Sequence, residues 1–451
     1  MQITPLLALS SLVALVLLLP LSVANFRRCF YWYLFGFVPF YYFFFDLYLN
    51  GAGLNVIPAA GKSIRDIVWA FVLISFLIWY LLSEMKDHAA CRFRDKSLLV
   101  LLYIFVSYSI VQGLRVFPQL GFFGFLLALR NTLEYFPLIF IPLALLRSRR
   151  DIERLMKCFV VLLFVVAAYG IVQFIFNIEN KNFTIIRPDF AYTSSGRVVT
   201  SVFPDYNYLA CFLILSVLLL LCTYKYLPNM AFSKLTMLLA VIVLLMTQSR
   251  TGLITFVIMV FGLLFFRRRV NQAMLAVICA GVLFLIIRPD LTLSRISTIG
   301  LKTDIRFAMW LFHLNDFMAR PFLGHGLGMF GSTNLTLRVA AGGPIAGVDN
   351  FYITTALNLG LVGLIAFAAI IFHVFAFSAR IIKSANDRFL RATVRGVGFA
   401  LVSILIFTVA FNQLEAFPIN LYFWFLIGLV YAIAKIHTGT NVGHKPAVQS
   451  A

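Results

Sequence analysis

The chain has 451 residues, of which 62% are apolar and only 12% charged, and its formal net charge is +20. A soluble domain carries about 45–50% apolar and about 25% charged residues, so the composition excludes a soluble globular protein and predicts a polytopic membrane protein. The positive charge does not require nucleic acid, because Lys and Arg accumulate in the cytoplasmic loops of membrane proteins. The six cysteines show no metal-ligand spacing.

The predicted fold class is an all-α membrane protein with about 13 transmembrane helices (12–14), each of roughly 17–25 residues. The first apolar stretch, Ile3–Val23, lacks a basic region before it and a clear cleavage site, so we expect a retained span rather than a signal peptide. The spans centre near residues 13, 39, 73, 105, 133, 168, 212, 239, 259, 280, 364, 404 and 426.

The loops between these spans alternate in charge. The basic loops are Arg27-Arg28, Lys86–Lys96, Arg147–Lys157, Lys225–Lys234, Arg267–Arg269, Arg380–Arg395 and the tail from Lys435. The positive-inside bias places them in the cytoplasm and the other loops outside. This predicts N-terminal transmembrane helices over residues 1–287, a large extracytoplasmic loop with amphipathic helices over 288–350, and C-terminal helices with a cytoplasmic tail over 351–451.

Two charged residues lie inside a predicted span, Arg130 and Glu134, with Asn131 between them. Their i,i+4 spacing puts them on one helix face, where they can pair. Charges in the membrane are costly and usually face a bundle interior or a cavity. The pair is therefore either a structural ion pair or the inner wall of a polar cavity.

Arginines are unexpectedly frequent in the outer loops. Net positive charge facing outward suggests an anionic ligand, and the planar fork of arginine suits phosphate or pyrophosphate. Solvated loop residues and anchors to lipid headgroups are the alternatives. The outer basic residues are Arg187, Arg197, Arg250, Arg288, Arg295, Lys302, Arg306, Arg320 and Arg338.

Two of these arginines have a distinctive setting. Arg250 lies in a Gln-Ser-Arg-Thr-Gly turn between two closely spaced spans, where its side chain can point into a cavity. Arg306 opens an amphipathic helix that either lies in the membrane interface and aims Arg306 at the cavity, or simply covers the spans. The apolar stripe of that helix is Phe307, Leu311, Leu314 and Met318, and the opposite side carries Arg306, His313, Asp316 and Arg320.

In order and spacing, five motifs between residues 248 and 363 resemble the O-antigen ligase/O-antigen polymerase superfamily; the rest of the chain resembles it by hydropathy only. These motifs are Gln248-Ser-Arg250-Thr-Gly252, Arg306-x-x-x-Trp310, Arg320-Pro-Phe-Leu-Gly324-His-Gly326-Leu-Gly328-Met-Phe330, Val348-Asp349-Asn350-Phe-Tyr352 and Leu359-Gly360-Leu-Val-Gly363.

The resemblance implies a metal-independent, GT-C-like glycosyltransferase without a cofactor, in the bacterial inner membrane with its active site on the periplasmic face. Its implied substrates are an undecaprenyl-diphosphate-linked oligosaccharide donor and a glycan acceptor, and its implied partners are the lipid bilayer, a chain-length regulator and a flippase, not nucleic acid. The expected catalytic residues are Asp349, Arg306 and Arg250, and the expected substrate-binding residues are Arg320, Arg338, Arg295, Arg197, His313, His325, Asn350 and Tyr352.

Ligases of the superfamily typically carry His-Asn where this chain has Asp349-Asn350. The difference favours a polymerase of a surface polysaccharide (O-antigen, capsule or exopolysaccharide) over a ligase to lipid A–core. Asp349 is either the general base for the acceptor hydroxyl or the N-cap of the next helix. His313 and His325 are rival bases, although His325 lies between glycines and fits a turn. A transporter of polysaccharide or lipid-linked glycan is the alternative from another class, but the chain shows no internal repeat.

Overall fold

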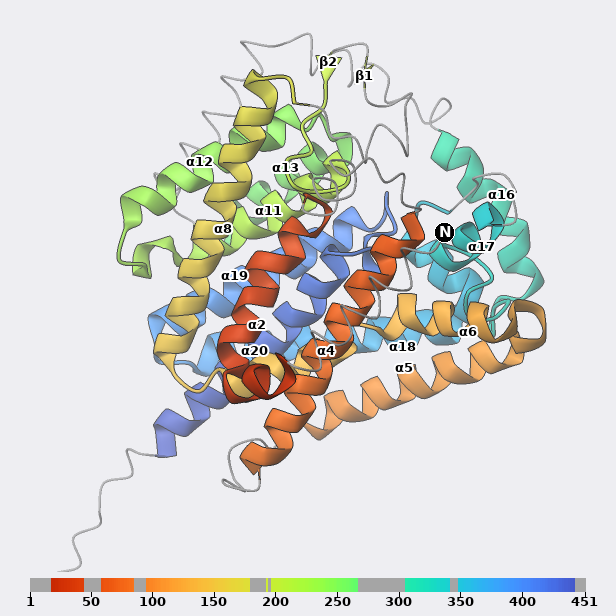
Figure 1. Cartoon of the computed structure of the whole chain (residues 1–451), viewed down its shortest axis with the longest axis horizontal. Helices are drawn as coiled ribbons and strands as arrows, with labels where there is room; N and C mark the ends of the chain where they lie inside the picture. Colours follow the sequence, from red (N-terminus) through yellow and green to blue (C-terminus); the bar gives the residue numbers. More distant parts are fainter. Residues whose placement is uncertain are drawn as a thin grey trace, which may run out of the picture.

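Long apolar helices make up almost all of the part of the chain that the computed structural model describes, which is residues 18–43, 58–84, 95–178, 192–193, 196–266, 305–340 and 348–442 (Figure 1). In chain order the described helices and strands are α2 (Phe26–Trp32), η1 (Tyr33–Phe37), α4 (Pro58–Glu84), α5 (Lys96–Arg115), α6 (Phe117–Leu133), η2 (Phe136–Ile139), α7 (Phe140–Leu145), α8 (Arg149–Ile175), β1 (Tyr192–Thr193), β2 (Gly196–Arg197), α11 (Tyr206–Thr223), η3 (Tyr224–Tyr226), α12 (Met230–Met246), α13 (Arg250–Phe266), α16 (Ile305–Ala319), α17 (Ser332–Ala340), α18 (Phe351–Ser384), α19 (Arg388–Phe407), η4 (Gln413–Glu415) and α20 (Ile419–Val442).

Eight of the described helical segments are long and apolar enough to cross a membrane. They are Ile64–Ser83, Lys96–Arg115, Phe117–Leu145, Arg149–Ile175, Tyr206–Tyr226, Phe351–Ser384, Arg388–Phe407 and Ile419–Thr438. Two shorter apolar helices, Met230–Met246 and Arg250–Leu263, lie at the spans predicted near residues 239 and 259. The all-α membrane class is thus confirmed, while the predicted spans near residues 13 and 280 lie outside the described residues.

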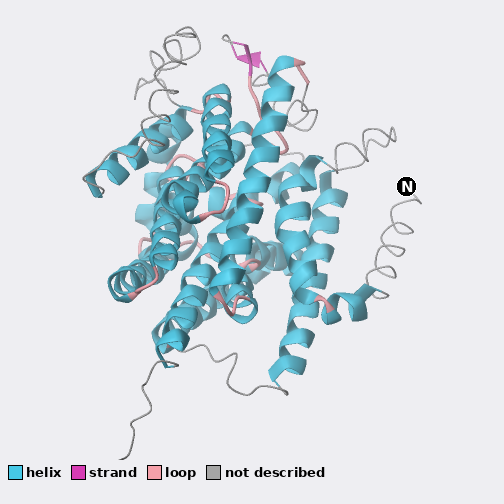
Figure 2. Ribbon diagram, turned by 90° about the vertical axis from the view of Figure 1, so that its left-hand side faces the viewer, coloured by secondary structure: helices cyan, strands magenta, loops and turns pink. Residues whose placement is uncertain are grey.

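Helices α11 and α20 form the centre of the bundle, and nearly nine-tenths of each span is buried (89% for both). Both are apolar on all sides, as expected of a helix that contacts protein all round. Helix α11 packs along α19, α12 packs on α8, and α5 packs on α18. The short antiparallel pair β1–β2 lies at one end of the bundle (Figure 2).

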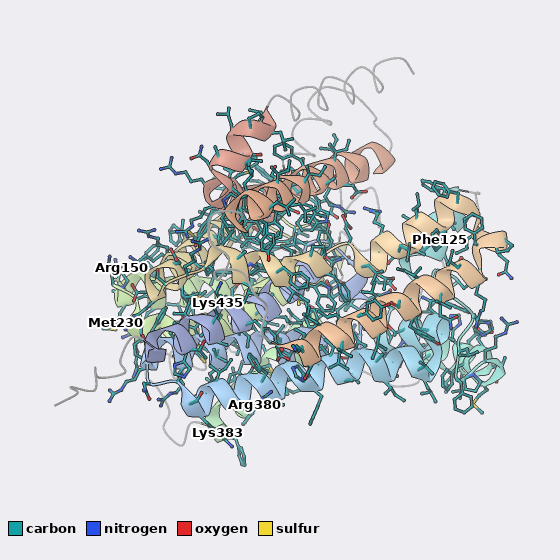
Figure 3. All side chains as sticks on the ribbon, turned by 90° about the horizontal axis from the view of Figure 1, so that it is seen from below. Phe125, Arg150, Met230, Arg380, Lys383 and Lys435 are labelled. Atoms are coloured by element: carbon teal, nitrogen blue, oxygen red, sulfur yellow. The ribbon has the colours of Figure 1, made fainter. Side chains whose placement is uncertain are left out.

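The predicted cytoplasmic loops come together at the other end. Figure 3 shows Arg150, Arg380, Lys383 and Lys435 at one side of the molecule and Phe125 at the opposite side. The contacts agree: Arg27 Nη2 donates to the Leu145 carbonyl (2.9 Å), Arg149 pairs with Asp387 (3.0 Å), and Lys435 Nζ donates to the Leu143 carbonyl (3.4 Å). We call this the basic end and the opposite one the loop end, because α16 and α17 lie there.

Candidate active site

Helix α18 is broken at Gly360, which has φ +66° and ψ −170° inside an otherwise helical segment. A break leaves backbone groups without their i→i−4 partners, and in a membrane these groups must find others within the protein. The glycine-rich loop after α16 supplies them. The His325 N–H donates to the Leu357 carbonyl (2.7 Å), and the Gly326 N–H donates to the Asn358 carbonyl (2.9 Å).

The bonding also runs in the other direction. The Leu361 N–H donates to the Pro321 carbonyl (2.8 Å), and the Tyr108 hydroxyl of α5 donates to the Leu359 carbonyl (2.9 Å). The backbone N–H and carbonyl groups of the loop and of the broken helix therefore pair with one another, much as those of two adjacent strands do. The glycine motif is a docking element that fixes the loop to the membrane helices.

Two glycines permit this close approach. Gly324 and Gly360 both have φ +66°, which side-chain-bearing residues rarely adopt. A Cβ on Gly324 would lie 2.5 Å from the Gly360 nitrogen, and a Cβ on Gly360 would overlap the Phe322 carbonyl. The side chain of Asn358 closes the same contact, because its Oδ1 accepts from the Phe330 N–H (2.8 Å) and its Nδ2 donates to the Phe330 carbonyl (3.2 Å).

Helix α16 presents its apolar stripe outward. Leu311 and Met318 are 55% and 65% exposed, whereas the His313 side chain is only 15% exposed. His313 Nδ1 lies 2.9 Å from an Asp316 carboxylate oxygen, and His325 Nε2 lies 2.7 Å from the Asp316 carbonyl. An apolar face turned away from the protein is the arrangement expected of a helix in the membrane interface.

Asn350 caps α18. Its Oδ1 accepts from the backbone N–H groups of Tyr352 (2.9 Å) and Ile353 (3.0 Å). The Tyr352 hydroxyl in turn donates to the Leu405 carbonyl of α19 (2.8 Å). Both predicted substrate-binding residues are therefore used in the fold. Asp349, which is half-buried and precedes the cap, does not serve as the N-cap, so its carboxylate has no part in capping.

Arg250 begins α13 and is half-buried. The preceding Ser249 anchors this turn, since its hydroxyl donates to Asn207 Oδ1 of α11 (2.8 Å) and accepts from the Gly252 N–H (3.1 Å). Helices α11 and α13 both pack on α19, and the backbone of Thr408, just after α19, accepts from the first N–H of α18 (3.1 Å). The turns that carry Arg250 and Asp349 thus lie at the same end of the bundle.

The remaining predicted site residues divide into three groups. Arg320, after α16, is exposed. Arg306 lies in the first turn of α16, Arg338 in the last turns of α17 and Arg197 in β2, each placed by its backbone. Arg295 lies outside the described residues.

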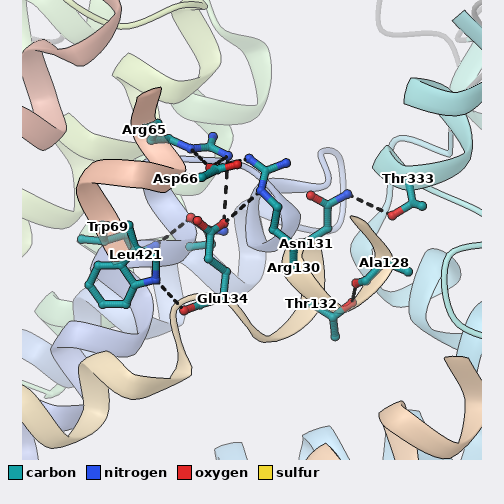
Figure 4. Close-up of polar contacts among 11 residues, drawn as sticks. Arg65, Asp66, Trp69, Ala128, Arg130, Asn131, Thr132, Glu134, Thr333 and Leu421 are labelled. Carbon is teal, nitrogen blue, oxygen red and sulfur yellow. Dashed lines mark hydrogen bonds and ion pairs between the residues drawn. The ribbon is translucent and has the colours of Figure 1, made fainter. Parts of the chain in front are cut away.

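A partly buried ionic network joins α4 to α6 (Figure 4). Arg130 Nη2 lies 2.8 Å from Asp66 Oδ1, and its Nε lies 3.8 Å from Glu134 Oε2, so the predicted i,i+4 pair exists. Arg65 Nη2 lies 3.0 Å from Asp66 and 4.0 Å from Glu134. Sequence analysis overlooked Arg65 and Asp66, which belong to the candidate span Ile64–Ser83; two adjacent charges at the start of an apolar run were the signal.

Sequence analysis also overlooked Glu415, the acidic residue of the short loop before α20. Its Oε2 accepts from the backbone N–H of Ser332 (2.9 Å) and from Asn412 Nδ2 (2.7 Å). Burial raises the pKa of this carboxyl. Next to it, Asn131 Nδ2 of α6 donates to Thr333 Oγ1 (2.9 Å). The first turn of α17 is therefore held by one membrane helix, α6, and by the loop before α20.

Glu415 also borders a cavity of about 20 Å³ beneath the glycine loop, which is room for a single water. The other polar side chains that line it are Thr132, Thr355 and Asn358. None of the predicted site residues whose side chains the structure describes lines this cavity. Among the described residues, no group of three or more His, Cys, Asp or Glu is arranged to hold a metal.

Residues 235–368 match a family model described as O-antigen ligase. The matched range contains Arg250, α16, the glycine loop, Asp349 and the break at Gly360. The match agrees with the motif resemblance, and the candidate spans agree with a multi-pass membrane protein. A search of curated proteins finds no match.

Proposed function

From the match of residues 235–368 to the O-antigen ligase family, we propose that this protein is a polymerase of a bacterial surface polysaccharide. It transfers a glycan from an undecaprenyl-diphosphate donor onto a sugar hydroxyl of another lipid-linked repeat unit, without a metal. The observation that carries the proposal is the geometry of the matched region: Arg250 and Asp349 both lie in turns at the loop end of the bundle.

The leaving group of this reaction is a diphosphate, so its departure requires fixed positive charge. Arg250 is half-buried in the first turn of α13, and Arg306 is in the first turn of α16. The N-terminal end of a helix adds partial positive charge at such positions. Arg306 precedes His313 by seven residues, and the His313 side chain is turned toward the protein.

The acceptor hydroxyl needs a base, and Asp349 is the candidate that the cap assignment favours. Because Asn350 caps α18, the cap does not depend on the neighbouring carboxylate of Asp349. In the proposed step, the hydroxyl oxygen bonds to the anomeric carbon and its proton passes to Asp349. The bond from that carbon to the diphosphate breaks, the diphosphate keeps the electron pair, and the anomeric centre inverts.

The orientation follows from charge. With the basic end in the cytoplasm, the loop end and its turns face the periplasm, where lipid-linked repeat units are extended. The implied localisation is the bacterial inner membrane, and a flippase that delivers the donor and a chain-length regulator are the expected partners.

A polymerase is favoured over a ligase because Asp349 stands where ligases of the superfamily typically carry histidine. The test is to reconstitute the purified protein in liposomes with lipid-linked repeat units alone. A ladder of longer glycans is expected. Product that forms only after lipid A–core is added would instead identify a ligase, and an absence of glycan transfer under both conditions would contradict both activities.

A further inference from the structure

We infer that the partly buried network between α4 and α6 binds hydroxyl groups of the acceptor sugar, as a subsite of the proposed polymerase. The subsite is formed by Arg65, Asp66, Arg130 and Glu134 with the phenols of Tyr33 and Tyr135. That the bound sugar is the acceptor substrate rests on the proposed function, but the binding of a sugar to this site can be tested separately.

The network needs no bound ion to balance its charge. Two arginines and two carboxylates sum to zero charge, and every one of them has an ionic partner within 4.0 Å. An anionic ligand such as diphosphate would therefore compete with Asp66 and Glu134 rather than complete the site. A neutral, hydrogen-bonding ligand fits the charge balance.

The unsatisfied atoms of this region identify the chemistry of that ligand. In the part of the chain that the structure describes, no protein group hydrogen-bonds to Glu134 Oε1, Gln413 Oε1, Arg130 Nε or the hydroxyls of Tyr33 and Tyr135. Leaving a buried polar group unpaired costs about 1–3 kcal/mol, so such a concentration points to a ligand. The set contains acceptors as well as donors. A hydroxyl both donates and accepts, whereas an unprotonated phosphate only accepts.

Aromatic side chains line the same place. Trp69 stacks on Tyr33 with ring centroids 5.8 Å apart and lies 5.4 Å from the ring of Tyr135, while its indole N–H donates to the Glu134 carbonyl (3.0 Å). Arg65 lies 5.0 Å from the centroid of the Phe417 ring, just after Gln413 in sequence. Apolar walls with a few polar groups are typical of sites for small ligands.

Tyr33 stands on an irregular backbone. It begins η1, a π-helical stretch over Tyr33–Phe37 that interrupts the first described helix. Such π-helical turns occur often at functional sites. This observation is independent of the hydrogen-bond pattern and marks the same side chain.

The network is reached from one side. The side chains of Asp66 and Arg130 are 34% and 20% exposed, whereas those of Arg65 and Glu134 are 9% exposed. Asn131, beside Arg130, bonds to Thr333 of α17 (2.9 Å). The open side of the network therefore adjoins α17, at the loop end of the bundle.

The experiment uses two substitutions that each remove one oxygen and no volume, Tyr33→Phe and Tyr135→Phe. The matched control is Tyr431→Phe, which removes a buried phenol oxygen one helical turn before Lys435 in α20. Full-length protein in nanodiscs is titrated with the free oligosaccharide repeat unit, released from its lipid by mild acid, and the fluorescence of Trp69 and the other tryptophans is followed. The acceptor KM, kcat and the Tm of each variant are measured in parallel.

Each variant at the network should weaken oligosaccharide binding and raise the acceptor KM by about three- to tenfold, the loss of one hydrogen bond. The kcat and inhibition by undecaprenyl diphosphate should stay at the wild-type values, and the Tm should not fall, because the phenol that is removed has no hydrogen-bond partner among the described residues. Oligosaccharide binding, KM and kcat of the control should equal those of the wild type. Unchanged binding, or a loss that appears only in Tm, overturns the subsite. If the wild-type protein binds the oligosaccharide in this tyrosine-dependent way but never extends it, the proposed polymerase fails and the subsite stands.

Discussion

Gly324 and Gly360 meet backbone to backbone, so that a Cβ on the first would lie 2.5 Å from the nitrogen of the second. This contact fixes the loop after α16 to the break in α18. Because α16 carries Arg306 and α18 begins just after Asp349, the contact holds together the two segments in which the proposed leaving-group and base functions lie.

Replacing either glycine by alanine should destabilise the protein by at least about 2 kcal/mol, because a left-handed backbone alone costs a side-chain-bearing residue about 1–2 kcal/mol and the Cβ would meet backbone atoms. The Tm of the purified protein in detergent measures this. The control is Gly398→Ala in α19, where a Cβ would meet nothing within 4 Å. That variant should be equal to wild type or up to about 1 kcal/mol more stable. Equal Tm values for Gly360→Ala and Gly398→Ala would contradict the docking role.

If Arg250 and Arg306 stabilise the diphosphate leaving group, replacing either should abolish glycan transfer without unfolding the protein. Arg250→Ala and Arg306→Ala should each lower kcat for glycan transfer by about 10²–10³-fold, the usual effect of removing one group that stabilises transition-state charge. The measurement is chain extension on lipid-linked repeats, with Tm as the check on folding. The control is Arg154→Ala at the basic end, whose side chain is 67% exposed. Polymer of normal length from either variant would contradict the proposed role of that arginine in binding the diphosphate.

The neighbours Asp349 and Asn350 should separate chemistry from stability. Asp349→Asn should lower kcat by about 10²–10⁴-fold, the usual contribution of a general base, while the protein stays folded. Asn350→Ala should lose about 1 kcal/mol of stability with the cap, and Asn350→Ser should recover most of it. If Asp349→Asn extends glycans normally, the base lies elsewhere, and His313 or His325 becomes the next candidate.

Glu415 predicts a pH-dependent stability. Burial raises its pKa in the folded protein, so the folded state holds this proton after the unfolded chain has released it. Its contribution is therefore present below the unfolded pKa and is lost as the pH rises through the folded pKa. Glu415→Gln, which imitates the protonated form, should remove the decrease in Tm between the unfolded and the folded pKa of this carboxyl. Glu415→Ala should instead be less stable at every pH, because the Ser332 N–H loses its partner. An unchanged slope in Glu415→Gln would show that another group titrates.

The sequence by itself determined the features that depend on local pattern. Segment length and apolarity gave the all-α membrane class and the positions of the described spans, because about 30 Å of hydrocarbon demands that length. Helical spacing identified the Arg130–Glu134 pair and the apolar stripe of α16. Loop charge identified the basic end, which the contacts of Arg27, Arg149 and Lys435 bear out.

Only the tertiary structure decided which residues meet across distance in the chain. Asp349 and Asn350 both suit an N-cap, and the backbone path into α18 gave that role to Asn350. Arg130 has its closest carboxylate in Asp66, on a different helix. Glu415 reaches the first turn of α17 from a loop more than eighty residues later. Local periodicity carries no record of such contacts, because they depend on how the helices pack and where an interrupted backbone finds its hydrogen bonds.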